Sequence, residues 1–330
     1  MPRDDDEMLP GLPPEFGSGV IGVCDVCGKR QAVIVLSRER FKLCVLDFLN
    51  KSWANSGAKP GAPLPLYRSE RVWFPTDLAK GGKAPAIALS PTKVVKHPVV
   101  LLTPDIYGLT TTVLDGAIRL AREGFEVLLP DVGKTPSVTA GDHLALRVGA
   151  RFRGGVPLES PRVVRLRRLY ADALRYLRGR EMVDPDKTGL LGVSYGASLA
   201  LAVAAEDRRV GALAVAYPVP VRPPELWKLV TAPVLFVDAQ GDPLSRQSRR
   251  QLEPWATSRE VNVRFYDAAG ARHHFLSRDL AAYDLTVAEA AWSEMVGFLR
   301  KSLLPQPPKP PTPPTVTSAP RPPAAAAPPA

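Results

Sequence analysis

Short apolar runs recur through the middle of the chain, and stretches with the spacing of amphipathic helices separate most of them. Each run has the length and the apolar content of a buried strand. Five such runs are residues 99–102, 127–129, 190–193, 213–216 and 234–237. Strands that alternate with helices pair in parallel, so the pattern predicts an α/β fold: a doubly wound, mostly parallel sheet with helices on both faces.

The ends of this pattern set the expected limits of the main domain. Residues 73–74 and 86–89 are strand-like, and a turn-forming glycine pair lies between them, which predicts a leading antiparallel hairpin. Residues 281–299 predict a closing helix. We therefore expect one large domain over residues 67–304.

The segments outside this domain lack a periodic apolar pattern. Residues 1–17 are acidic and then punctuated by proline and glycine, which predicts a flexible lead. Residues 57–66 are expected to be a linker. In residues 305–330, 12 of the 26 positions are proline, which predicts a disordered, polyproline-like tail without a catalytic role. Its prolines could bind an aromatic-lined groove of a protein partner.

Composition narrows the class of protein. The chain has 330 residues, 45% of them hydrophobic, and a formal net charge of +10. Its acidic start lacks the features of a secretory signal, and its apolar stretches fall well short of the ~18 residues of a membrane span. We therefore expect a cytoplasmic protein that does not enter a membrane. Seven arginines between Arg162 and Arg180 interleave with apolar residues three and four apart, which predicts an amphipathic helix with a solvated basic face and argues against nucleic acid as a partner.

The motif Gly192-Val193-Ser194-Tyr195-Gly196 carries the clearest chemistry. It follows an apolar run and precedes a helix-prone stretch, which is the order that a nucleophile elbow needs. Such an elbow holds a serine on a strained turn and leaves no room for side chains two residues before or after it. The motif predicts a serine hydrolase with Ser194 as its nucleophile. The alternative is an ordinary turn with a glycine-flanked serine.

A serine hydroxyl needs a base that accepts its proton, and an acid orients that base. Asp242 lies in the turn after the predicted strand 234–237, and Asp238, closer to the strand, is the competing candidate. His273 follows the strand-like run 263–266 and is the expected base. The remaining histidines outside this loop, His97 and His143, are expected at the surface.

Three segments resemble the dienelactone hydrolase family of the α/β-hydrolase superfamily. Residues 101–109 are similar to the family's strand followed by an acidic residue, isoleucine, an aromatic residue and glycine, residues 124–131 resemble its next strand, and residues 270–275 match its histidine loop. In that loop the base is followed by any residue and then phenylalanine, which favours His273 over His274. The resemblance covers most of the main domain and implies an α/β-hydrolase fold.

The resemblance also implies further site residues. The backbone N–H groups of Ile106 and Tyr195 would form the oxyanion hole. Asp105 corresponds to the family's acidic residue near the nucleophile, and here it would tune polarity or help to position the substrate. Ser194 stands where the founding members have cysteine, so activation of its hydroxyl falls to His273.

Arginines hold the substrate carboxylate in the family's founding activity, and the match to them is loose. Arg278 lies near the expected offset after the histidine, and Arg147, Arg151 and Arg153 lie before the arginine-rich helix. Each of them is a surface arginine in the simpler interpretation. The substrate therefore stays open.

All three cysteines fall in one short stretch. Cys24, Cys27, Cys44 and Asp47 have the spacing C-x2-C-x16-C-x2-D, which resembles a small zinc-ribbon module over residues 18–56 with Asp47 as the fourth ligand of a structural zinc. The alternatives are three unrelated reduced cysteines and a C-x-x-C redox pair. No cofactor is expected for catalysis.

Together these residues predict a hydrolase that cleaves small-molecule carboxylic esters or lactones through an acyl-enzyme on Ser194, with His273 and Asp242 completing a triad. The alternative is an interaction protein, in which the zinc-ribbon-like module binds protein or nucleic acid and the hydrolase domain is a non-catalytic scaffold. The order of serine, acid and histidine along the chain favours the enzyme.

Overall fold

The computed structural model describes residues 34–36, 41–43, 67–79, 81–131, 155–278 and 280–304. Our predictions for the lead, the linker and the tail lie outside the described residues. Two short strands, β1 (Ile34–Leu36) and β2 (Phe41–Leu43), pair antiparallel ahead of the main domain.

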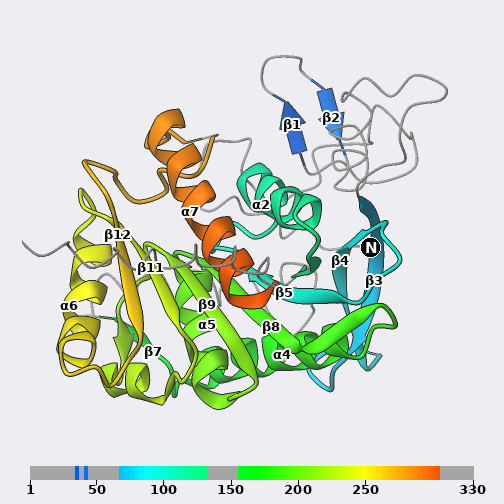
Figure 1. Ribbon diagram of the computed structural model, residues 1–330, viewed down its shortest axis with the longest axis horizontal. Coiled ribbons are helices and arrows are strands. Elements are labelled where there is room, and N and C mark those ends of the chain that lie inside the picture. The colour runs from blue at the N-terminus through cyan, green and yellow to red at the C-terminus, as the bar shows by residue number, and fades with distance from the viewer. Residues whose placement is uncertain are drawn as a thin grey trace, which may run out of the picture.

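An eight-stranded sheet forms the centre of the main domain (Figure 1). The strand order is β12-β11-β9-β8-β5-β6-β4-β3. The six strands from β12 to β6 are parallel, whereas β4 is antiparallel to both β6 and β3. The strands are β3 (Tyr67–Pro75), β4 (Lys83–Pro91), β5 (His97–Thr103), β6 (Glu126–Pro130), β8 (Val183–Val193), β9 (Val210–Ala216), β11 (Val234–Ala239) and β12 (Val263–Ala268).

The apolar pattern explains this sheet. Its inner parallel strands are buried on both faces, which is why they appear in the sequence as continuous apolar runs rather than as alternating ones. Each of the five predicted runs lies inside an observed strand. The predicted hairpin is the β3–β4 pair, and its turn contains Gly81 and Gly82 with φ of 84° and 72°, backbone that glycine adopts without strain.

Helices cover both faces of the sheet, as predicted (Figure 1). Helices α2 and α7 enclose one buried apolar cluster, and α4, α5 and α6 enclose a second cluster on the opposite face. The helices are α2 (Thr111–Arg122), α4 (Pro161–Arg178), α5 (Tyr195–Glu206), α6 (Pro243–Thr257) and α7 (Leu285–Leu303). The closing helix begins later than predicted, because the Asp284 carboxylate caps it by accepting a hydrogen bond from the Val287 N–H.

A second pair of strands, β7 (Val156–Pro157) and β10 (Val221–Arg222), and the short 3-10 helix η3 (Pro224–Leu229) complete the described elements. No helix within the described ranges has both the length and the apolar content needed to cross a membrane.

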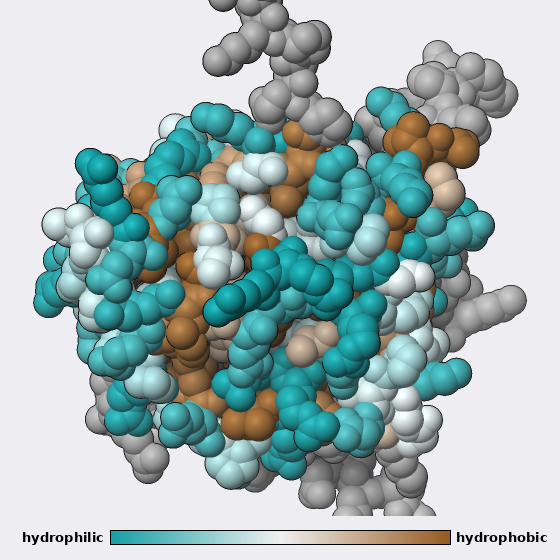
Figure 2. Space-filling model, turned by 60° about the horizontal axis from the view of Figure 1, so that its bottom comes forward, coloured by the Kyte–Doolittle hydropathy of each residue, from teal (hydrophilic) through white to brown (hydrophobic). Residues whose placement is uncertain are grey.

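Helix α4 confirms the predicted amphipathic pattern and corrects one detail. Its predicted apolar positions are all buried: Val163, Leu166, Leu169, Tyr170, Ala173, Leu174 and Leu177. Arg178, however, does not belong to the solvated face. It is buried where α4 ends beside β8, its Nε donates to Oγ1 of Thr188 at 2.9 Å, and its Nη1 pairs with Asp207. The face at the bottom of Figure 1, where α4 runs, is covered mainly by hydrophilic residues in Figure 2.

The predicted surface position of His97 is wrong. His97 is 3% exposed at the start of β5. Its Nδ1 lies 3.1 Å from the carbonyl oxygen of Gly124, and its Nε2 lies 2.8 Å from that of Lys93. Two backbone acceptors therefore satisfy a buried ring, which local sequence could not reveal. His143 lies outside the described residues.

Candidate active site

Ser194 lies between β8 and α5, at the carboxyl end of a central strand, and its φ is 54°. Residues other than glycine adopt this left-handed backbone only at a cost. A Cβ atom at Gly192 would lie 2.5 Å from Cα of Ala197, and one at Gly196 would lie 2.1 Å from the carbonyl oxygen of Pro104. Both positions require glycine, for the steric reason that the sequence motif suggested.

The strands on either side of β8 hold this turn in place. The Ser194 N–H donates to the carbonyl oxygen of Ala216 in β9 at 2.9 Å. The hydroxyl of Thr103, the last residue of β5, donates to the carbonyl oxygen of Gly196 at 2.8 Å. Sequence reasoning missed Thr103, although its place directly after a predicted strand was an available signal.

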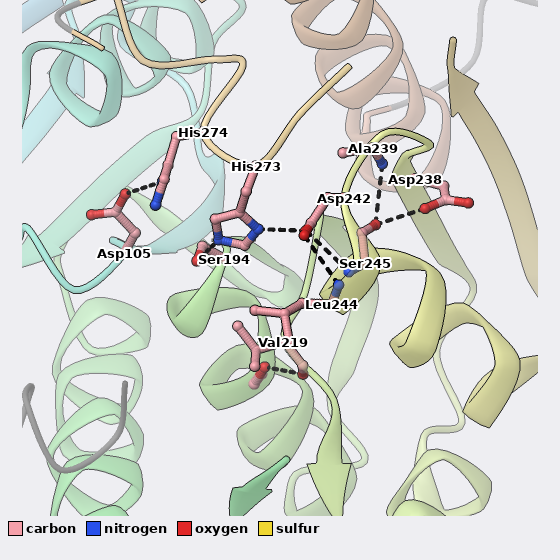
Figure 3. A network of polar contacts seen from close by, with 11 residues as sticks. Asp105, Ser194, Val219, Asp238, Ala239, Asp242, Leu244, Ser245, His273 and His274 are labelled. Atoms are coloured by element: carbon pink, nitrogen blue, oxygen red, sulfur yellow. Dashed lines mark hydrogen bonds and ion pairs between the residues drawn. The ribbon is translucent and has the colours of Figure 1, made fainter. Parts of the chain in front are cut away.

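His273 lies between Ser194 and Asp242 (Figure 3). Oγ of Ser194 is 2.8 Å from Nε2 of His273, and Nδ1 of His273 is 2.5 Å from Oδ2 of Asp242. With a proton on Nδ1, the imidazole donates to Asp242 and accepts from the serine hydroxyl, as a general base must. The structure thus brings the three predicted residues into one hydrogen-bonded chain.

Asp242 caps the N-terminus of α6. Its Oδ1 accepts a hydrogen bond from the Leu244 N–H and its Oδ2 accepts one from the Ser245 N–H, both at 3.0 Å. Burial by itself would raise the pKa of Asp242, but the hydrogen bond and charge of His273 and the two backbone donors outweigh it, so the pKa lies below the usual aspartate value. Asp242 therefore faces the imidazole as a carboxylate at neutral pH.

Asp238, the competing acid, has other partners. Its Oδ1 accepts a hydrogen bond from Oγ of Ser245 at 2.7 Å, and its Oδ2 lies 3.1 Å from Nη1 of Arg249. In Figure 3 its carboxylate points away from His273. The geometry therefore favours Asp242 as the partner of the imidazole.

Asp105 and His274 meet beside this chain (Figure 3). Nδ1 of His274 lies 3.4 Å from Oδ2 of Asp105, while Oδ1 of Asp105 accepts a hydrogen bond from the Tyr107 N–H at 2.8 Å. Burial lowers the pKa of His274 more than the neighbouring Asp105 raises it. The structure therefore brings His273 to Ser194 and turns His274 toward Asp105.

The two predicted oxyanion-hole segments are adjacent. Tyr195 is the first residue of α5, and Ile106 lies in the loop after β5. The close approach of Gly196 to Pro104 shows that this loop passes directly beside the serine turn. Backbone donors at a helix N-terminus and in such a loop suit a developing oxyanion.

Arg278, one of the arginines predicted to bind a substrate carboxylate, forms ion pairs with two carboxylates of the protein instead. Nη1 of Arg278 lies 3.3 Å from Oδ2 of Asp115, and its Nη2 lies 3.9 Å from Oε1 of Glu289. Its charge is thus directed toward α2 and α7. The other candidates, Arg147, Arg151 and Arg153, lie outside the described residues.

The predicted zinc ligands also lie outside the described residues. They are Cys24, Cys27, Cys44 and Asp47. In the ranges that the structure describes, histidine, cysteine, aspartate and glutamate do not form a group of three or more that could hold a metal ion.

The arrangement of the main domain is that of an α/β-hydrolase fold. It has the strand order of the class, a serine on a strained strand-to-helix turn, and an acid and a histidine that follow later strands. Residues 84–303 match the dienelactone hydrolase family. The chain belongs to this family, as its sequence motifs implied.

Known proteins agree with this assignment. The chain is 27% identical over 243 residues to a "probable 2-oxo-3-(5-oxofuran-2-ylidene)propanoate lactonase" of a Bradyrhizobium species, which covers 68% of the chain and 92% of the relative. It is 30% identical over 219 residues to a carboxymethylenebutenolidase of Rhodococcus opacus, covering 62% and 81%. The fold is similar to that of a dienelactone hydrolase-like promiscuous phosphotriesterase from metagenomic libraries, with a TM-score of 0.59, 20% identity, and coverage of 72% and 99%. The chain is therefore a hydrolase of carboxylic esters or lactones.

Proposed function

We propose that the hydrolysis proceeds through an acyl-enzyme on Ser194, with His273 as the general base and Asp242 as the acid that orients it. The observation that carries this proposal is the hydrogen-bonded chain from the Ser194 hydroxyl through both nitrogens of His273 to Asp242. It is supported by the strained backbone of Ser194 on a strand-to-helix turn, which is the conformation that carries the nucleophile in enzymes of this kind.

The geometry suits a two-step acyl transfer. Oγ of Ser194 attacks the carbonyl carbon while its proton moves to Nε2 of His273. The N–H groups of Ile106 and Tyr195 stabilise the resulting oxyanion. His273 then gives its proton to the leaving alkoxide, the acyl–oxygen bond breaks, and Ser194 carries the acyl group. A water molecule then attacks the acyl carbon while its proton moves to Nε2 of His273. The acyl–Oγ bond breaks as His273 returns that proton to Ser194, which releases the acid and restores the enzyme.

Lactones are the substrates that the relatives support. The Bradyrhizobium relative is described as a lactonase and the Rhodococcus relative as a carboxymethylenebutenolidase. In a lactone the leaving alkoxide stays attached to the acyl group, so the ring opens before water releases one product. We propose a cytoplasmic enzyme that acts on small lactones or esters. Arg147, Arg151 and Arg153 stay candidates for a substrate carboxylate, since Arg278 is already paired.

A fluorophosphonate probe tests this function against the alternative of a non-catalytic scaffold. We expect the wild-type chain to be labelled on the peptide that contains Ser194, and Ser194→Ala to stay unlabelled. A folded wild-type protein that the probe does not label, and that binds a protein or nucleic acid through residues 18–56, would support the interaction protein instead.

We also propose that Cys24, Cys27, Cys44 and Asp47 hold a structural zinc, because a module of roughly 40 residues buries too little apolar surface to stay folded without a staple. Elemental analysis of untagged protein should find about one zinc per chain, and Cys27→Ser should lose it. Metal-free protein whose residues 18–56 are equally protected in hydrogen exchange would show that the cysteines are ordinary packing residues.

A further inference from the structure

Backbone strain gathers around His273. In the described part of the chain, four residues other than glycine have positive φ, and three of them meet at this imidazole: Ser194 (54°), Tyr217 (37°) and His274 (66°). For a bulky residue such as tyrosine this backbone is a true outlier. Strain of this kind persists where the surrounding structure enforces it, and it is concentrated at functional sites. The serine turn accounts for Ser194, whereas Tyr217 and His274 need a separate reason.

Both of these residues direct a ring at His273. The ring centroid of Tyr217 lies 5.0 Å from that of His273 at an interplanar angle of 68°. The ring of His274 lies 4.3 Å away at 86°. Near-perpendicular contacts at these distances are a favourable geometry for aromatic rings. The strained backbone and the ring contacts therefore occur in the same two residues.

The ring of Tyr217 is rigidly held. Tyr217 is fully buried, and its N–H donates to the carbonyl oxygen of Val237 at 2.8 Å. Its ring also packs on Phe275 with a centroid distance of 5.3 Å. Since Tyr217 follows β9 and Val237 lies in β11, this ring is fixed to the sheet itself.

The ring of His274 has an anchor of its own. Its Nδ1 faces Asp105 at 3.4 Å, and its centroid lies 5.2 Å from the Tyr107 ring. Because burial lowers the pKa of His274, the ring is uncharged at neutral pH. It can therefore pack against His273 without placing a second positive charge there when His273 accepts a proton.

We propose that Tyr217 and His274 are positioning residues that hold the ring of His273 in line with its two hydrogen-bond partners, and that Asp105 anchors His274. The hydrogen bonds at Nδ1 and Nε2 fix two atoms of the ring, and the edge contacts resist rotation about the line that joins them. This inference rests on the proposed function, and it assigns to both residues an action through His273 rather than on the substrate.

His274→Asn is the central test, since asparagine tolerates left-handed backbone but carries no ring. We expect kcat for a short-chain p-nitrophenyl ester to fall on the order of 10- to 100-fold, with KM changed by no more than about twofold, because a misaligned base slows chemistry without altering substrate contacts. Arg259→Asn is the matched control. It makes the same kind of change at the fourth positive-φ residue, which is exposed and lies before β12, away from His273, so kcat should stay within about twofold of wild type.

A spectroscopic signature separates positioning from general loss of structure. The chain has four histidines, so the Nδ1 proton of His273 can be assigned by NMR of ¹⁵N-histidine-labelled full-length protein without any substrate. We expect a sharp, strongly deshielded signal in wild type and in Arg259→Asn, and a broadened or lost signal in His274→Asn. His274→Gly removes the ring and relaxes the backbone. It should behave like His274→Asn, and it takes over the test if the asparagine variant does not fold.

Unchanged kcat with an unchanged Nδ1 signal in these His274 variants would overturn the proposal, as would a loss expressed mainly in KM. A loss of kcat as large as that of His273→Ala would identify His274 as a base, and so would contradict both the proposal and the proposed function. If wild type hydrolyses neither lactones nor esters, the proposed function fails by itself, because the NMR comparison needs no turnover and still decides whether the rings hold His273.

Discussion

Within the described residues, one buried polar cluster lies at the carboxyl ends of the parallel strands (the carboxyl edge) and another at their amino ends (the amino edge). The two clusters differ in the groups to which their hydrogen bonds lead. At the carboxyl ends of the parallel strands, Asp242 and His273 lead to the hydroxyl of Ser194. At the amino ends, Oε1 of Glu126 lies 2.7 Å from Nε of Arg180, beside a cavity of about 590 Å³. Both edges therefore contain a buried carboxylate and a nitrogen partner.

The cluster at the amino edge is closed on itself. Oε1 of Glu126 also accepts a hydrogen bond from the Ser90 hydroxyl at 3.0 Å, and Nη2 of Arg180 lies 2.6 Å from Oε1 of Glu70. These contacts tie β3, β4 and β6 to the chain that follows α4. Burial raises the pKa of Glu126 more than Arg180 and Ser90 lower it. The cluster joins neighbouring segments and leads to no nucleophile.

At the carboxyl edge the hydrogen bonds do not form a closed network, and the backbone is strained. The hydrogen-bonded chain stops at a serine oxygen, and three of the residues around it have positive φ. None of the four residues of the amino-edge cluster, Glu70, Ser90, Glu126 and Arg180, has positive φ. The comparison teaches that a buried carboxylate points to a reaction where its chain of hydrogen bonds leads to a nucleophile on strained backbone, and to stability where its partners form a closed network.

The largest effect on turnover is expected at Ser194 and His273. Ser194→Ala and His273→Ala should each lower kcat by roughly 10³-fold or more, and the double variant should lose little beyond either one, because a single proton relay links the two residues. Steady-state kinetics on a lactone and an ester measure this. Independent, multiplicative losses would contradict a shared relay.

The acid gives the next largest effect. Asp242→Asn should lower kcat on the order of 10²- to 10⁴-fold, because the amide no longer selects the tautomer with a proton on Nδ1 of His273. Asp238→Asn, in the strand β11 just before Asp242, is the matched control. It should leave kcat within about tenfold, since Asp238 contacts Ser245 and Arg249 instead. The reverse ranking would transfer the orienting role to Asp238.

At the amino edge the expected effect is on stability and not on turnover. Arg180→Ala leaves Glu126 buried without its cation, so the free energy of unfolding in urea should fall by about 3 kcal/mol. Adding Glu126→Gln to this variant should recover part of the loss, since a neutral side chain is less costly to bury. The kcat of folded protein should be unchanged. A large loss of kcat in the folded variant would mean that the two edges are coupled.

The smallest effect is a difference in the sign of pH dependence. The pKa of Asp242 is lowered in the folded protein, so its contribution to the unfolding free energy is present above the unfolded-state value of about 4 and is lost as pH falls further. The pKa of Glu126 is raised, so its contribution is present below about pH 4 and is lost as pH rises through the folded value.

Urea unfolding between pH 3 and pH 7, chosen as roughly the range that spans both carboxylates, measures this difference. The unfolding free energy of wild type minus that of Asp242→Asn should rise with pH. The unfolding free energy of wild type minus that of Glu126→Gln should fall with pH. Two slopes of the same sign would contradict the contrast between the edges.

Sequence reasoning succeeded where the chain itself encodes the geometry. The glycines around Ser194 are required by atoms only a few residues away, or by the loop at Pro104 that crosses the turn. The placement of His273 and Asp242 in one hydrogen-bonded chain with Ser194 could be predicted because each follows a recognisable strand, while their catalytic roles stay a prediction. The apolar stripe of α4 follows in the same way from helical spacing.

It failed where partners come from distant segments. The buried state of His97 depends on a carbonyl group 27 residues away, and that of Arg178 depends on Asp207. Thr103, the last residue of β5, contacts the serine turn, and Tyr217, directly after β9, contacts the imidazole. Their positions directly after predicted strands were a weak signal, since the spacing of residues along one strand does not show which side chain of the next strand it meets.

Trapping of the acyl-enzyme tests the central claim most directly. Full-length protein mixed with a p-nitrophenyl ester and quenched in acid within milliseconds should gain the mass of one acyl group on the peptide that contains Ser194, and His273→Ala should gain far less in the same time. Turnover that persists in Ser194→Ala, with no adduct on that peptide in wild type, would contradict the account.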